Sequence, residues 1–159
     1  MDNRDIISAV SAIIAGIALF LNNFYANQRE RRKEFRGRLD KTIEYIENTR
    51  EQAMHFHSSD YDSQKSEEII YRFESLYRMV QGIPYYNDRP EIVGTYNLFK
   101  RSVTLDSFDK SNFYKKEHGS DYTKEIYYTS EALIERLEDI YYSRFPMKIN
   151  NIIARILGY

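Results

Sequence analysis

The feature of this sequence that most constrains its fold is an apolar stretch near the N-terminus, Ile6 to Tyr25 (IISAVSAIIAGIALFLNNFY). Its first sixteen residues contain nothing more polar than two serines. As a helix they span about 24 Å, slightly less than the roughly 30 Å of a bilayer's hydrocarbon core. Continuing to Tyr25 brings the length to about 30 Å, with Asn22 and Asn23 near the headgroups and Phe24 and Tyr25 as an interfacial belt. We therefore predict a transmembrane helix over residues 6–25.

A dense basic run, RERRKEFRGRLDK from Arg29 to Lys41, follows the apolar stretch directly. Its seven Lys and Arg residues against three acidic residues give it a side-chain charge of +4. Because Lys and Arg are retained on the cytoplasmic side of a span, we predict that residues 1–5 are extracytoplasmic and that the rest is cytoplasmic, at the inner (plasma) membrane. The same charges can bind anionic lipid headgroups at about 1 kcal/mol for each charge. The side chains expected to contact headgroups or to set the topology are Arg29, Arg31, Arg32, Lys33, Arg36 and Arg38.

An apolar stretch of this kind has two other common interpretations, a buried core helix and a secretory signal peptide. A signal peptide carries its positive charge before the apolar region, whereas here the charge comes after it. A core helix rarely needs sixteen apolar or small residues on all of its faces in a chain of 159 residues. The pattern therefore favours a span over both alternatives.

Small residues recur at four-residue intervals within the predicted span, at Ser8, Ala12 and Gly16. Small side chains at this spacing let two helix backbones approach closely, which is how membrane helices associate in lipid. We therefore predict that the span packs against a second copy of itself through this face. The protein would then be a homo-oligomer.

The remaining sequence predicts an all-α fold, in which the N-terminal span continues into a small cytoplasmic bundle of four to five helices. A basic juxtamembrane helix is expected over residues 26–57, and a helical cytoplasmic domain over residues 58–159. Few Gly and Pro residues, six and three in the chain, favour helices over a turn-rich β architecture. After a polar loop at 57–66, a second helix should begin near Ser66 and stop at Gly82.

A third helix should begin at Pro90, because proline suits the first helical position. Its predicted apolar face comprises Ile92, Val93, Tyr96, Leu98, Phe99 and Val103. The fourth helix is predicted from Tyr122 to Ser143, with Ile126, Leu133, Leu137 and Ile140 as one apolar stripe. The irregular segment before it is expected to be held to the core by Phe108, Phe113 and Tyr114. A short amphipathic helix over residues 147–157 ends the chain. Its apolar face, almost all Ile and Leu, either closes the bundle or lies in the bilayer interface.

The sequence contains few residues that carry chemistry. It has no cysteine, no glycine-rich phosphate loop and none of the common hydrolase motifs. The one patch with ligand-like chemistry comprises His55, His57, Asp60 and Asp62. Two histidines at i and i+2 of a helix point about 200° apart, so only a frayed helix end would direct both at one Zn²⁺ or Mn²⁺. We therefore predict no metal and no cofactor.

Arg50 and His55 match the Arg-x4-His spacing of HEPN-type ribonucleases, which are also small helical bundles. The resemblance covers these two residues and implies that the pair acts on an RNA backbone across a dimer. Glu51 departs from the pattern, because a small polar residue or Asn is common at that position in the family. An exposed arginine and a histidine at a helix end explain the same two residues without catalysis.

We expect a non-enzymatic function: a single-pass membrane protein that recruits or senses an unidentified protein partner at the cytoplasmic face. Residues 42–159 carry a net charge of −4, which argues against nucleic acid as a partner. One alternative is a toxin-like or phage-exclusion (phage defence) effector whose oligomerised spans perturb the membrane. A second alternative is the HEPN-like ribonuclease.

Overall fold

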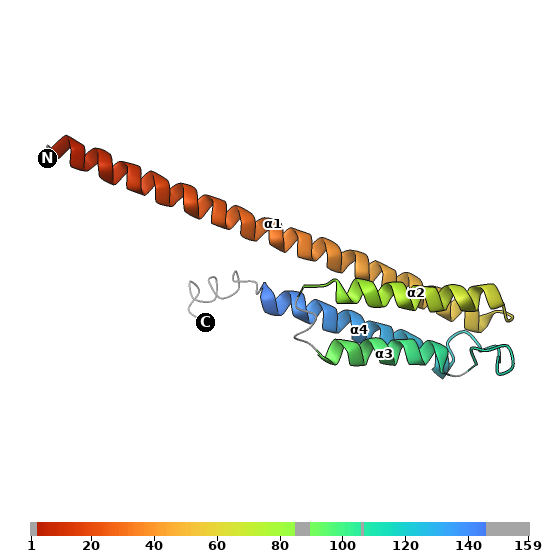
Figure 1. Ribbon diagram of the computed structural model, residues 1–159. Coiled ribbons are helices and arrows are strands. Elements are labelled where there is room, and N and C mark those ends of the chain that lie inside the picture. Colours follow the sequence, from red (N-terminus) through yellow and green to blue (C-terminus); the bar gives the residue numbers. More distant parts are fainter. Residues whose placement is uncertain (1–2, 85–89, 106, 146–159) are drawn as a thin grey trace, which may run out of the picture. The chain divides into compact units, whose positions relative to one another are not determined.

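The computed structural model describes residues 3–84, 90–105 and 107–145, and the described part of the chain is all-helical (Figure 1). Four helices follow one another in the order α1 (Asn3–Ser58), α2 (Ser63–Gln81), α3 (Pro90–Thr104) and α4 (Asp121–Arg144). The helical fold class is thereby confirmed. The predicted C-terminal helix over 147–157 lies outside the described residues.

Helix α1 passes through both of the compact units into which the chain divides, Met1–Arg36 and Gly37–Tyr159. The predicted span and the predicted juxtamembrane helix are therefore parts of one continuous helix of 56 residues. The division between the units falls within the predicted juxtamembrane segment. Residues 37–58 of α1 belong to the same unit as α2, α3 and α4.

The first unit exposes its apolar side chains. Within Val10–Ser58, the most apolar 18-residue window of α1 has a mean hydropathy of 1.4, and none of it is buried. By length and composition this helix can cross a membrane, and a signal sequence near an N-terminus has the same properties. The large side chains that lie between 43% and 69% exposed are Val10, Ile13, Ile14, Ile17, Leu19, Phe20, Leu21, Phe24 and Tyr25.

In its described residues, the second unit is a four-helix bundle in which neighbouring helices run in opposite directions. Arg38, near the start of this part of α1, donates a hydrogen bond of 3.4 Å to the carbonyl of Gly82 at the end of α2. At the other end of the bundle, His57 and Tyr122 pair the end of α1 with the start of α4. Antiparallel neighbours in this sequence give the bundle an up-down-up-down order.

The core of the bundle is built from the apolar stripes of the helices and is rich in aromatic rings. Phe73 of α2 lies fully buried with its ring centroid 5.1 Å from that of Phe99 and 6.3 Å from that of Tyr96, both on α3. The Tyr96 hydroxyl donates to the Phe73 carbonyl at 2.8 Å, so its polar atom is satisfied inside the core. The stripe predicted for α4 is buried throughout: Ile126, Leu133, Leu137 and Ile140.

The predicted helix boundaries are correct where Gly or Pro marks the helix end, and wrong where a capping side chain sets the start of the helix. Helix α2 ends at Gln81 before Gly82, and α3 begins at Pro90, as predicted. Helix α2 begins at Ser63, three residues before the predicted start near Ser66. The reason is Asp62, whose carboxylate accepts hydrogen bonds from the backbone N–H groups of Gln64 (2.9 Å) and Lys65 (3.3 Å).

The segment between α3 and α4 contacts the core through two of the three predicted aromatic residues. Phe108 is buried, and the Phe113 ring lies 5.3 Å from the ring of Phe56, centroid to centroid. Tyr114 is 71% exposed, so its predicted role in the core is wrong. Its ring instead lies beside the Lys116 ammonium, which is 5.0 Å from the ring centroid.

Candidate functional site

The predicted packing face of the span is open in the structure. Ser8, Ala12 and Gly16 are all exposed, and a Cβ added at Gly16 would meet no other atom within 4 Å. An exposed row of small residues on an apolar helix leaves room for a second backbone to approach. These small residues provide a surface on which a partner helix can pack, and they carry no charged or titratable group.

The predicted headgroup contacts lie along α1 after the apolar window. Arg36 is half-buried, and the other five predicted side chains are exposed: Arg29, Arg31, Arg32, Lys33 and Arg38. Lys33 forms an exposed ion pair with Glu30 at 3.1 Å, an interaction worth little in water. Arg38 serves the bundle as well, since its guanidinium donates to the Gly82 carbonyl at the end of α2.

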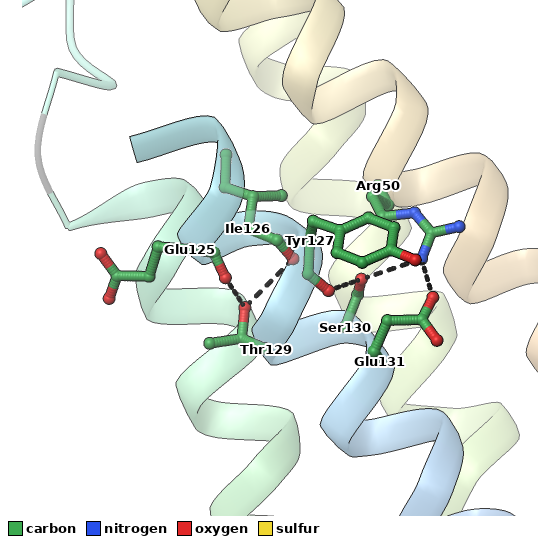
Figure 2. Close-up of polar contacts among 7 residues, drawn as sticks. All are labelled: Arg50, Glu125, Ile126, Tyr127, Thr129, Ser130 and Glu131. Carbon is green, nitrogen blue, oxygen red and sulfur yellow. Dashed lines mark hydrogen bonds and ion pairs between the residues drawn. The ribbon is translucent and has the colours of Figure 1, made fainter. Parts of the chain in front are cut away.

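Arg50 joins α1 to α4 within the bundle (Figure 2). Its guanidinium forms an ion pair with the Glu131 carboxylate and lies 3.3 Å from the Ser130 hydroxyl. The same guanidinium sits 4.8 Å from the centroid of the Tyr127 ring, which adds a cation–π contact. The Arg50 side chain is only 13% exposed, so all of these contacts constrain it to one place.

His55 lies on a different face of α1 from Arg50. Residues five apart on an α-helix point about 140° away from each other, so the two side chains diverge within one chain. The exposed His55 ring lies 3.5 Å from the Ser59 hydroxyl and lines a cavity of about 460 Å³ between α1 and α2. The other lining residues are Glu51, Gln52, Lys65, Glu68 and Ile69. The structure therefore does not bring the Arg-x4-His pair together in one site within the chain.

The four residues considered as metal ligands have separate roles in the structure. Asp62 caps α2, Asp60 pairs with Lys115 at 3.3 Å, His55 lies at the cavity, and His57 is buried. In the part of the chain that the structure describes, no three His, Cys, Asp or Glu residues are grouped so that they could hold a metal ion. The ligand-like patch is a consequence of a helix end followed by a capped turn.

His57 lies in the last turn of α1, at the helix end where it was predicted, but its burial there was not predicted. Its side chain is fully buried, its Nε2 lies 2.9 Å from the Val103 carbonyl, and its Nδ1 has no hydrogen-bond partner. Burial lowers the pKa of His57 to about 4, the hydrogen bond to Val103 opposes this shift, and the nearby Lys116 charge adds to it. The sequence feature that could have predicted this burial is the apolar stripe of α1, because His57 follows the buried Ala53 by four residues and so lies on the same face of the helix.

No protein-family model, curated protein or solved structure gives a significant match to this chain.

Proposed function

We propose that this protein is a single-pass membrane-anchored interaction module, whose helical bundle recruits or senses a protein partner at the cytoplasmic face. The observation that carries the proposal is the unburied apolar window of α1. Six of its side chains, from Ile13 to Leu21, are large aliphatic or aromatic groups that lie 43–69% exposed. Leaving such groups in water forgoes on the order of 10 kcal/mol relative to burying them.

The hydrocarbon core of a bilayer would surround the apolar side chains of this window, so they would leave water without packing against a protein partner. A core helix of a soluble protein would have most of its apolar window buried, and here the buried share is zero. A cleaved signal sequence would also be exposed, but α1 continues as one helix from Asn3 to Ser58 into the bundle. That continuity favours an anchor that stays attached to the domain.

The basic residues after the window support the proposed orientation and a contact with anionic lipids. The exposed cations from Arg29 to Arg38 follow the apolar window directly along the same helix. Positive charge beside a span favours the cytoplasmic side, which would place the bundle there. Headgroup binding by these side chains would add to the hold of the single helix.

An interaction role is supported by the surface of the bundle. Large aromatic side chains lie exposed on it, and tyrosine is well suited to protein interfaces because it joins apolar area to a polar tip. They are Tyr71, Tyr127, Tyr128 and Tyr142, each 44–66% exposed. Self-association of the anchors through the face of Ser8, Ala12 and Gly16 would present several bundles to a partner at once.

Membrane extraction of the full chain tests the proposal. We expect the protein expressed in bacterial cells to sediment with membranes, to resist extraction with alkaline carbonate and to be released by detergent. The mass of the extracted chain should equal that of all 159 residues. Recovery in the soluble fraction, or a mass lacking the N-terminal apolar segment, would show that the segment is not an anchor.

A further inference from the structure

His57 stands where four segments of the bundle meet. It lies in the last turn of α1, and its Nε2 is 2.9 Å from the carbonyl of Val103 at the end of α3. The hydroxyl of Tyr122, at the start of α4, donates to the same carbonyl at 3.2 Å and lies 3.3 Å from Nε2. The backbone N–H of Lys116, in the connection between α3 and α4, donates to the His57 carbonyl at 2.7 Å.

The ring of His57 is packed in a cage of four aromatic rings. The neighbouring ring centroids lie between 4.7 and 6.4 Å from that of His57, and they belong to Phe56, Phe108, Phe113 and Tyr122. Because a carbonyl only accepts hydrogen bonds, Nε2 carries the proton that it donates to Val103. Nδ1 is then a bare acceptor, buried and without a partner.

A second proton on this ring would create a buried charge with no hydrogen-bond acceptor for the added proton. The new N–H at Nδ1 would have no acceptor, and a buried charge without a partner is costly. The charged and titratable groups around the ring do not offset that charge. The Lys116 ammonium lies 5.0 Å from the Tyr122 ring centroid and is itself positive, Tyr122 is a neutral phenol, and Val103 offers only its carbonyl.

The connection between α3 and α4 depends on this cage. Phe108 and Phe113 insert rings against His57 and Phe56. Ser107 holds a positive φ of 57°, and its hydroxyl bonds both the N–H and the carbonyl of Tyr114, at 2.5 and 2.9 Å. A residue other than glycine adopts this conformation only when surrounding contacts enforce it, so loss of the cage would release the segment.

We propose that His57 is an acid-sensitive latch: neutral, it holds the segment 107–120 closed against the bundle, and protonated, it releases that segment. Release would expose the rings of Phe108 and Phe113, which pack against Phe56 and His57 in the closed form. The inference rests on contacts inside the bundle and holds whether or not α1 crosses a membrane.

The direction of the effect follows from the two forms of the bundle. In the closed form the pKa of His57 is lowered to about 4, whereas in an open form the ring meets water and titrates near its ordinary value of 6.5. The closed form is therefore fully favoured above pH 6.5 and loses its advantage as the pH falls toward 4. The open population should rise about tenfold for each pH unit in this window, and about 300-fold over all of it.

Hydrogen exchange on the full chain in mild detergent, which keeps the protein in solution whether or not α1 spans a membrane, tests the latch. We expect the protection factors of the Tyr114 and Lys116 amides, corrected for intrinsic exchange, to fall about tenfold per pH unit between pH 6.5 and 4.5. The variant His57→Gln keeps an N–H for the Val103 carbonyl and does not titrate, so its protection should be independent of pH in this range. The matched control His55→Gln, in the same turn but exposed, should behave as the wild type.

Two outcomes would overturn the proposal. One is a wild-type loop whose protection does not change with pH, and the other is the same pH profile in His57→Gln. Should His57→Gln fail to fold, the wild-type His57 ring signal, followed by NMR, replaces it. We expect that signal to titrate together with the loss of loop protection, and titration near pH 6.5 with the loop still closed would refute the latch.

Discussion

Replacing Ile14 and Ile17 together with lysine is expected to release the protein from the membrane. Both side chains lie on the exposed apolar window of α1, 62% and 55% exposed. A lysine at the centre of a span costs roughly 2.5–3.5 kcal/mol on insertion scales, so the pair should cost about 5–7 kcal/mol. We expect the variant to shift from the carbonate-resistant membrane fraction to the soluble fraction.

The matched control places two lysines on the bundle. Tyr71→Lys with Tyr128→Lys adds the same charge at positions that are 65% and 66% exposed. This variant should remain with the membrane as the wild type does. Release of the control as well, or retention of the Ile14 and Ile17 variant, would show that the apolar window does not hold the protein in lipid.

The stability of the bundle should depend strongly on Phe73. The side chain is completely buried and contacts the rings of Tyr96 and Phe99. Phe73→Ala removes this packing and leaves a cavity, so we expect the free energy of unfolding to fall by about 3–5 kcal/mol. Chemical denaturation of the full chain in detergent, followed by circular dichroism, measures the change.

Tyr71→Ala is the control for Phe73→Ala on the same helix. Its side chain is 65% exposed, so its removal should change the free energy of unfolding by no more than about 0.5 kcal/mol. Similar losses in both variants would contradict a core centred on α2 and α3. A loss below about 1 kcal/mol for Phe73→Ala would do the same.

Much of the fold follows from periodicity because burial in a bundle imposes the helical repeat on the sequence. The α4 stripe from Ile126 to Ile140 was predicted residue by residue and is buried. Gly82 and Pro90 mark helix ends through their own backbone preferences, so their positions were predicted correctly. Leu98 shows the limit of the pattern, since it was placed on the apolar face of α3 and is 54% exposed.

The candidate site residues were harder to place because their partners are distant in the sequence. Arg50 looked like half of a spaced pair with His55, yet its contacts are Glu131, Ser130 and Tyr127 on α4. No spacing rule predicts a partner 81 residues away. Asp62 looked like a metal ligand because capping and metal binding use the same carboxylate chemistry, and only the backbone geometry tells them apart.

The burial of His57 could not be predicted from the sequence for two reasons: its position at a helix end suggests exposure, and the residues that bury it are distant in the sequence. In the sequence it reads as a polar residue at a helix end, where exposure is the ordinary expectation. Its burial arises from the segment 107–116, which folds back over it and is joined to it by the Lys116 hydrogen bond. The conformation of a loop of this length is set by tertiary contacts, so its effect on His57 follows only from the folded structure.

The measurement that tests membrane crossing most directly is labelling of single cysteines in intact bacterial cells. The chain has no cysteine, so Asn3→Cys and Ser111→Cys each give one thiol without a background. If α1 crosses the membrane with the bundle inside, a membrane-impermeant maleimide should label Asn3→Cys in intact cells and Ser111→Cys only after lysis. Labelling of Ser111→Cys in intact cells, or protection of Asn3→Cys until lysis, would contradict that topology.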